Sequence, residues 1–182
     1  MDETIRKASH FVFGIGIAAF ILTFEKQLVI SVLAIVLLAG LILSELVSKG
    51  YRIPVVSAAI EMMERKDVTP GKGALFFAMG ALIPLILLGP AEVAVGVLAL
   101  AVLDSVATVV GLRFGRYRIY NGKSMEGAAG GIAATAIVLL LLLPPERAVL
   151  VAVIAGAVEL LSPVDDNLVI PIIVAVVLTI LG

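Results

Sequence analysis

Long apolar runs separated by short polar breaks dominate the chain and predict membrane-spanning helices. A helix that crosses a bilayer needs about 20 apolar residues, and each run is close to that length. We therefore expect an all-α polytopic membrane protein, a compact bundle of about seven transmembrane helices. The expected spans are Ala8–Phe24, Gln27–Leu46, Gly73–Gly89, Ala91–Leu112, Met125–Leu143, Glu146–Leu161 and Asn167–Leu181.

The composition supports this prediction. Hydrophobic residues make up 62% of the 182 residues, and the mean hydropathy is +1.20, values that exclude an ordinary soluble domain. The chain has no cysteine, so disulfides and thiolate metal sites are excluded. We expect one transmembrane domain over residues 1–182.

Cations are distributed unevenly between the two ends of the expected helices. Seven spans place the termini on opposite sides, and one side then carries only Lys26 and Arg147. Because cytoplasmic loops are rich in Lys and Arg, the other side, with the N-terminus, is expected to be cytoplasmic. The outer connections are tight turns, so any site is expected on the cytoplasmic side. The cytoplasmic cations are Arg6, Lys7, Lys49, Arg52, Arg65, Lys66, Lys72, Arg113, Arg116, Arg118 and Lys123.

One carboxylate, Asp104, lies deep in the fourth expected span, nine residues before Arg113. At helical rise this is roughly 13 Å, close to the middle of a hydrocarbon core about 30 Å thick. An ionisable group there costs about 2.5–3.5 kcal/mol, so it is a functional candidate. The structural alternative is a polar residue that seals helix contacts.

A basic, glycine-rich loop follows Asp104. The small polar face Asp104, Thr108, Gly111 and Gly115 permits close approach of a backbone or ligand. A buried carboxylate can hold a divalent cation, and a cationic glycine-rich loop can donate to phosphate oxygens, so the two together suit a metal–triphosphate site. For each arginine taken singly, the alternative is an ordinary membrane anchor.

Other polar groups flank the expected cytoplasmic side. Arg6, Lys7 and the only histidine, His10, share one helical face at the cytoplasmic end, and the spacing alone favours a basic anchor at the interface. Lys72 either reaches a phosphate or is solvated. Ile60–Arg65, in the one long loop, is expected to form a short amphipathic helix at the interface.

The last cytoplasmic turn carries Asp165 and Asp166 and no cation. Two adjacent carboxylates suggest contacts with a divalent metal or a substrate hydroxyl. They also suit the start of the seventh helix as capping residues. Both interpretations stay open at this point.

Three separated motifs together resemble those of the polyprenol kinase family, which includes dolichol kinase, phytol kinase and the CTP-dependent diacylglycerol kinase. The N-terminal motif is Arg6, Lys7, His10 and Gly14. The central motif is Asp104, Ala107, Gly111, Gly115, Lys123, Ser124, Glu126 and Gly127. The C-terminal motif is Glu159, Asp165, Asp166, Asn167, Ile170 and Pro171.

The resemblance implies a CTP-dependent kinase that phosphorylates a polyprenol-like, dolichol-like or diacylglycerol-like alcohol, with Mg2+ or another divalent cation. Expected partners are the lipid alcohol, CTP and the bilayer of a microbial cell membrane; nucleic acid is not expected, and a homodimer is allowed. The implied catalytic residues are Asp104, Arg6 and Lys7. The implied nucleotide-binding residues are Arg6, Lys7, His10, Lys72, Gly111, Gly115, Arg116, Lys123, Ser124, Glu126 and Gly127. The implied metal ligands are Asp104, Glu126, Asp165 and Asp166.

Two other function classes are alternatives to a kinase. A CDP-lipid synthase would use a similar cation-rich site, but the K-R-x4-K-D run and later H-G-G associated with phosphatidate cytidylyltransferase are missing. A small transporter or lipid-binding scaffold should show matched halves with broken helices, and the sequence has no such repeat.

The uneven charge distribution generates a topological prediction. Cysteines introduced as Lys26→Cys and Lys72→Cys should react with a membrane-impermeant thiol reagent from opposite faces of the membrane. Labelling of both from the same face in intact cells would show that the number of spans is wrong.

Overall fold

The computed structural model describes residues 3–51, 53–54, 69–119 and 122–182. The short interfacial helix expected at Ile60–Arg65 lies outside these residues. The described part of the chain contains helices and no strand, so the predicted all-α class is confirmed. Its helices are α1 Glu3–Thr23, α2 Lys26–Ser48, α4 Lys72–Leu87, α5 Pro90–Phe114, α6 Met125–Leu139, α7 Pro145–Leu161 and α8 Asp166–Leu181.

Each expected span falls on one of these helices. The main difference is at the N-terminus, where α1 begins at Glu3 rather than Ala8 and therefore includes Arg6 and Lys7. An acidic residue in the first turn favours helix formation there because it complements the positive end of the helix dipole. By length and composition, α2 and α5 could cross a membrane, and α4, α6 and α8 are shorter apolar helices.

Local signals in the sequence explain where the helices begin. Pro90 and Pro145 occupy first helical positions, where the missing N–H has no intrahelical partner to lose. Ser124 caps α6 by accepting a hydrogen bond from the Gly127 backbone N–H at 3.1 Å. Asp165 caps α8 in the same way through the Asn167 backbone N–H at 3.2 Å.

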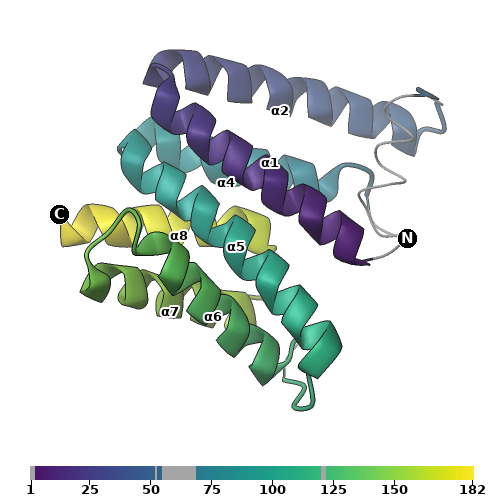
Figure 1. Cartoon of the computed structure of the whole chain (residues 1–182). Helices are drawn as coiled ribbons and strands as arrows, with labels where there is room; N and C mark the ends of the chain where they lie inside the picture. Colours follow the sequence, from purple (N-terminus) through teal and green to yellow (C-terminus); the bar gives the residue numbers. More distant parts are fainter. Residues whose placement is uncertain (1–2, 52, 55–68, 120–121) are drawn as a thin grey trace.

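Helix α5 forms the centre of the bundle (Figure 1). It packs against α1 and α4 on one side and against α6 and α8 on the other. Most of its apolar stretch, 72%, is buried, whereas only 17% of that of α2 is buried. Helix α2 therefore lies at the edge of the bundle, and the start of α1 and the end of α8 lie at opposite ends of the bundle.

Glycines allow α5 and its neighbouring helices to pack closely. Some of these glycines lie on the neighbouring helices and others lie on α5 itself. A side-chain carbon at Gly14 of α1 would overlap the Cβ of Ala101 on α5. One at Gly131 of α6 would lie 2.9 Å from the Cβ of Ala107. One at Gly96 of α5 would lie 2.6 Å from the carbonyl oxygen of Pro171 on α8. Small residues at helix contacts are the usual means of close packing between membrane helices.

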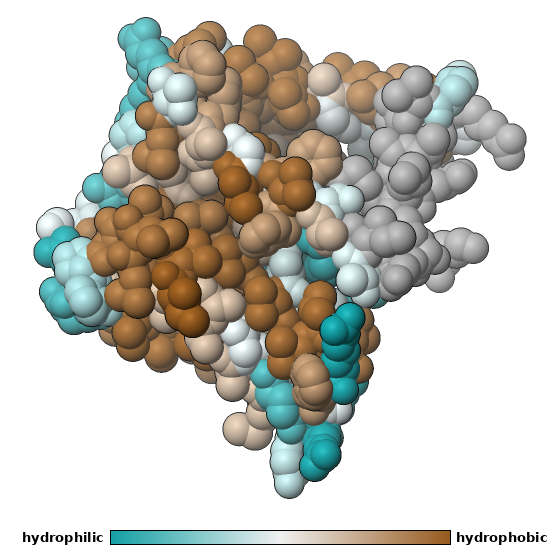
Figure 2. Space-filling model, viewed as in Figure 1, coloured by the Kyte–Doolittle hydropathy of each residue, from teal (hydrophilic) through white to brown (hydrophobic). Residues whose placement is uncertain are grey.

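The outer surface of the bundle is largely apolar. Figure 2 shows hydrophobic residues over the middle of one face and hydrophilic residues gathered toward its edges. Large apolar side chains are exposed on every helix. They include Val12, Ile35, Ile86, Leu112, Ile137, Val153 and Ile180.

The packing of α1 against α5 generates a prediction with a control in the same helix. Gly14→Ala should destabilise the protein by about 1–3 kcal/mol, because the new methyl group would overlap Ala101. Gly16→Ala should be neutral or stabilising by about 0.5–1 kcal/mol, because no atom lies within 4 Å of the added carbon. The free energy of unfolding, measured by SDS titration of the protein in detergent micelles, checks both. Equal effects of the two substitutions would contradict the packing described here.

Candidate functional site

The deepest charge predicted from the sequence, Asp104, forms a buried ion pair with Lys7. Both carboxylate oxygens of Asp104 on α5 accept hydrogen bonds from the Lys7 Nζ on α1. Each of the two residues is only 8% exposed. The neighbouring Ser105 hydroxyl donates to the Lys7 backbone carbonyl at 3.1 Å, which fixes α1 against α5. The N-terminal and central motifs therefore meet at Asp104.

A second lysine joins the central motif to the C-terminal one. The Lys123 Nζ donates to the Glu159 backbone carbonyl at 2.5 Å and to the Asp166 Oδ2 at 2.6 Å. It also lies 3.5 Å from the Glu159 Oε1. Lys123 thus extends from the loop before α6 to the end of α7 and the start of α8.

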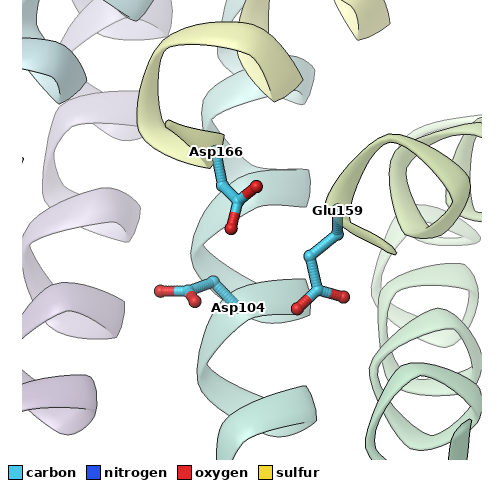
Figure 3. A group of neighbouring side chains, drawn as sticks. All are labelled: Asp104, Glu159 and Asp166. Carbon is cyan, nitrogen blue, oxygen red and sulfur yellow. The ribbon is translucent and has the colours of Figure 1, made fainter. Parts of the chain in front are cut away.

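Three carboxylates from three helices converge between these lysines (Figure 3). Asp104 on α5, Glu159 on α7 and Asp166 on α8 each offer one oxygen, and these oxygens lie within 4.8 Å of one another. Glu159 is 5% exposed, and its Oε2 is buried without a hydrogen-bond partner in the described part of the chain. Carboxylate oxygens are the ligands that hard divalent cations prefer, so this group fits such an ion.

The charges of the cluster almost balance. With all groups ionised, three carboxylates face two ammonium groups, which leaves one net negative charge. Buried charges are stable only when paired. Asp104 is paired with Lys7 and Asp166 with Lys123, whereas the Oε2 of Glu159 lacks a donor among the described residues.

The glycines of the central motif place Lys123 by letting the start of α6 close onto α5. A side-chain carbon at Gly111 would lie 3.0 Å from the Ser124 Oγ, and one at Gly115 would lie 2.7 Å from it. One at Gly127 would lie 2.6 Å from the Ala107 carbonyl oxygen. The Ser124 side chain and the Gly127 backbone therefore lie against the glycines of α5, and the phosphate contacts predicted for Gly111, Gly115, Ser124 and Gly127 stay predictions.

Glu126 stabilises the loop between α5 and α6 and lies outside the three-carboxylate group. Its Oε2 accepts hydrogen bonds from the backbone N–H of Arg116 at 3.1 Å and of Tyr117 at 3.3 Å. The side chains of Arg116 and Glu126 are at the protein surface: Arg116 is exposed, and Glu126 is partly exposed. The metal and nucleotide roles predicted for these two residues stay predictions.

The two adjacent aspartates of the last turn have different surroundings. Asp166 belongs to the three-carboxylate group, whereas Asp165 caps α8. The Asp165 Oδ2 also lies 3.9 Å from the Lys72 Nζ, which sits over the Phe76 ring, 5.4 Å from its centroid. Lys72 is therefore at the same end of the bundle as the cluster, and a metal role for Asp165 stays a prediction.

The remaining residues of the N-terminal motif flank Lys7 on α1. Arg6 pairs with Glu3 one turn earlier. His10 packs edge-on against Phe77, with 5.1 Å between ring centroids, and its Nε2 is buried without a hydrogen-bond partner in the described part of the chain. His10 lies three residues after Lys7 and therefore on the same face of α1, whereas Arg6, the immediate neighbour of Lys7, points to a different side of the helix.

Glu159 is the residue that the sequence analysis left out of its predicted site. It entered only as part of the C-terminal motif. A signal was present, because an acidic residue in the last turn of a helix opposes the helix dipole and has no stabilising role there. The convergence of α7 with α5 and α8, however, cannot be deduced from one sequence.

Comparison with known proteins gives one informative match. The chain is 39% identical over 184 residues to the uncharacterized protein MJ1137 of Methanocaldococcus jannaschii, covering 98% of this chain and 93% of that protein. The chain belongs to the family of MJ1137. No family model and no solved structure matches it. MJ1137 carries no named activity, so the kinase resemblance stays a prediction.

Proposed function

We propose that this member of the MJ1137 family is a multi-pass membrane enzyme, a CTP-dependent kinase that phosphorylates a lipid alcohol at the cytoplasmic face. One observation carries the proposal. Charged residues from three motifs far apart in the sequence meet in one cluster, in which Lys7 pairs with Asp104, Lys123 contacts Glu159 and Asp166, and the three carboxylates lie together. A purely structural bundle has no need to gather five charges, three of them buried, at one place.

The surface of the bundle supports a position within the bilayer. Monomeric soluble proteins rarely expose contiguous apolar patches larger than a few hundred Å2. Here apolar side chains cover the middle of the face in Figure 2, and exposed apolar residues occur on every helix. The charged cluster lies toward the end of the bundle that carries the predicted cytoplasmic cations.

The residues of the cluster suit phosphoryl transfer, which depends mainly on positioning and neutralisation of charge. Lys7 and Lys123 would donate to phosphate oxygens of CTP, and the burial of the site strengthens such contacts. Arg6, His10 and Lys72 surround the same end of the bundle and would add donors. A divalent cation held by Asp104, Glu159 and Asp166 would neutralise phosphate charge when bound.

The two substrates would reach the cluster by different routes. The hydroxyl of a long lipid would enter from the bilayer between helices, while CTP would enter from the aqueous end beside the exposed loop that contains Arg116 and Arg118. The acceptor and the γ-phosphate would then meet near Asp104.

A labelled-substrate assay tests the proposed reaction. Purified protein would be incubated with CTP labelled on the γ-phosphate, Mg2+ and a panel of polyprenols, dolichols and diacylglycerols. Label in the lipid is the expected result. Label in pyrophosphate, with a phosphorylated lipid as acceptor, would instead identify a CDP-lipid synthase, and label in neither product would overturn the proposal.

Asp104 supplies the mutational test, with a control on the same helix. Asp104→Asn keeps the volume and an acceptor for Lys7 but removes the charge, so the rate should fall at least about a hundredfold. Glu92→Gln, in the first turn of α5 at the opposite end of the bundle, should leave the rate within about twofold of the wild type. Rates would be normalised to the monodisperse, folded fraction of each protein. Near-normal lipid phosphorylation by Asp104→Asn would remove Asp104 from the mechanism.

A further inference from the structure

We infer that Lys7 and Lys123 are resident counterions of a divalent-cation site formed by Asp104, Glu159 and Asp166, and that the lysines transfer to phosphate oxygens when the cation binds. The cation and a triphosphate would then bind with positive coupling. The phosphate half of this inference rests on the proposed function, whereas the cation half does not.

Glu159 is the observation that separates a ligand site from a closed network of ion pairs. It is 5% exposed, points toward Asp104 in Figure 3, and has a buried Oε2 without a donor among the described residues. A carboxylate oxygen that is removed from water and left unpaired is costly. A cation bound between Asp104, Glu159 and Asp166 would give the Glu159 carboxylate a partner and use the other two carboxylates as well.

The two lysines of the cluster together carry the same charge as the inferred divalent cation. Lys7 contacts both oxygens of Asp104, and Lys123 contacts Asp166 and Glu159. Together they carry two positive charges. A divalent cation and two ammonium groups cannot share this volume without strong repulsion, because like charges a few ångströms apart interact strongly away from water. Cation binding therefore requires the lysines to move.

The lysine side chains are suited to this movement. Each ammonium ends a flexible four-carbon chain and can change partners without displacing its helix or loop. The Lys123 side chain is already 26% exposed. Oxygens of a triphosphate beside the cation would replace the carboxylates as acceptors. Because each ligand then creates a favourable environment for the other, the two must bind with reciprocal coupling.

An exposed ion pair at the end of α2 illustrates the difference and provides controls. Lys49 and Glu45 pair across one turn of α2, and both side chains are 63% exposed. Water can therefore hydrogen-bond to the oxygens and N–H groups that the pair leaves unbonded. Glu45→Gln and Lys49→Met change the same charges as Glu159→Gln and Lys123→Met without touching the cluster.

Direct measurement of Mn2+ binding tests the inference without reference to catalysis. Electron paramagnetic resonance of free Mn2+ would give the Kd of purified full-length protein in detergent, with and without β,γ-methylene-CTP. Without nucleotide, Lys123→Met should lower the Mn2+ Kd about fivefold or more, because a resident positive charge is gone. With nucleotide, Glu159→Gln should raise it about tenfold or more, because a ligand is gone. Lys123→Met should also weaken the tightening that the nucleotide produces in the wild type.

Two results would overturn the inference. One is a Glu159→Gln protein that binds Mn2+ as tightly as Glu45→Gln in the presence of the nucleotide analogue. The other is a Lys123→Met protein that binds Mn2+ alone no more tightly than Lys49→Met. The unfolding temperature of each variant shows whether it still folds. Lys123 is chosen over Lys7 because it is partly exposed, so its substitution leaves the buried Asp104 paired. Normal Mn2+ coupling without lipid phosphorylation would leave this inference standing and overturn the proposed function.

Discussion

The buried ion pair between Lys7 and Asp104 is the interaction on which the rest of the structure depends. Two charges that are each 8% exposed can remain ionised only if they stay together, since removal of one partner from a buried pair costs about 3–5 kcal/mol. The pair therefore fixes the register of α1 against α5. It also requires α1 to extend back to Glu3, so that Lys7 lies within the helix and not in a preceding loop.

Close helix packing makes this pair geometrically accessible. Gly14 allows α1 to approach α5 at Ala101, three residues before Asp104, and Gly127 allows α6 to approach α5 at Ala107, three residues after it. The same close packing of α6 on α5 brings Lys123 to Glu159 and Asp166. Packing and chemistry are therefore linked in this bundle: the small residues that give tight contacts between helices also set the distances between the charged groups.

Much of the fold follows from one-dimensional patterns. The apolar runs predicted all seven described helices, and proline and capping residues set their starts. The burial of Asp104 was also predictable, because this residue stands within a long apolar run, whereas its depth in a bilayer stays a prediction. These predictions share a local cause and need no knowledge of which helices are neighbours.

The composition of the charged cluster depends on tertiary contacts and was only partly predicted. Asp165 and Asp166 are adjacent carboxylates in the sequence, but Asp165 is the capping residue that precedes α8 and Asp166 is the first residue of the helix, so Asp166 reaches the cluster while Asp165 lies beside Lys72. Glu126 and Glu159 both lie near the ends of expected spans. The first bonds to its own loop, and the second faces Asp104 because α7 packs next to α5 and α8.

The location of a bound cation is the most direct test of the account. A structure of the full chain with Mn2+ and β,γ-methylene-CTP would place the metal by its anomalous scattering. The account predicts a single peak between the carboxylates of Asp104, Glu159 and Asp166, with Lys7 and Lys123 on phosphate oxygens. A peak at Glu126 or Asp165, or lysines that still hold the three carboxylates while nucleotide is bound elsewhere, would contradict it.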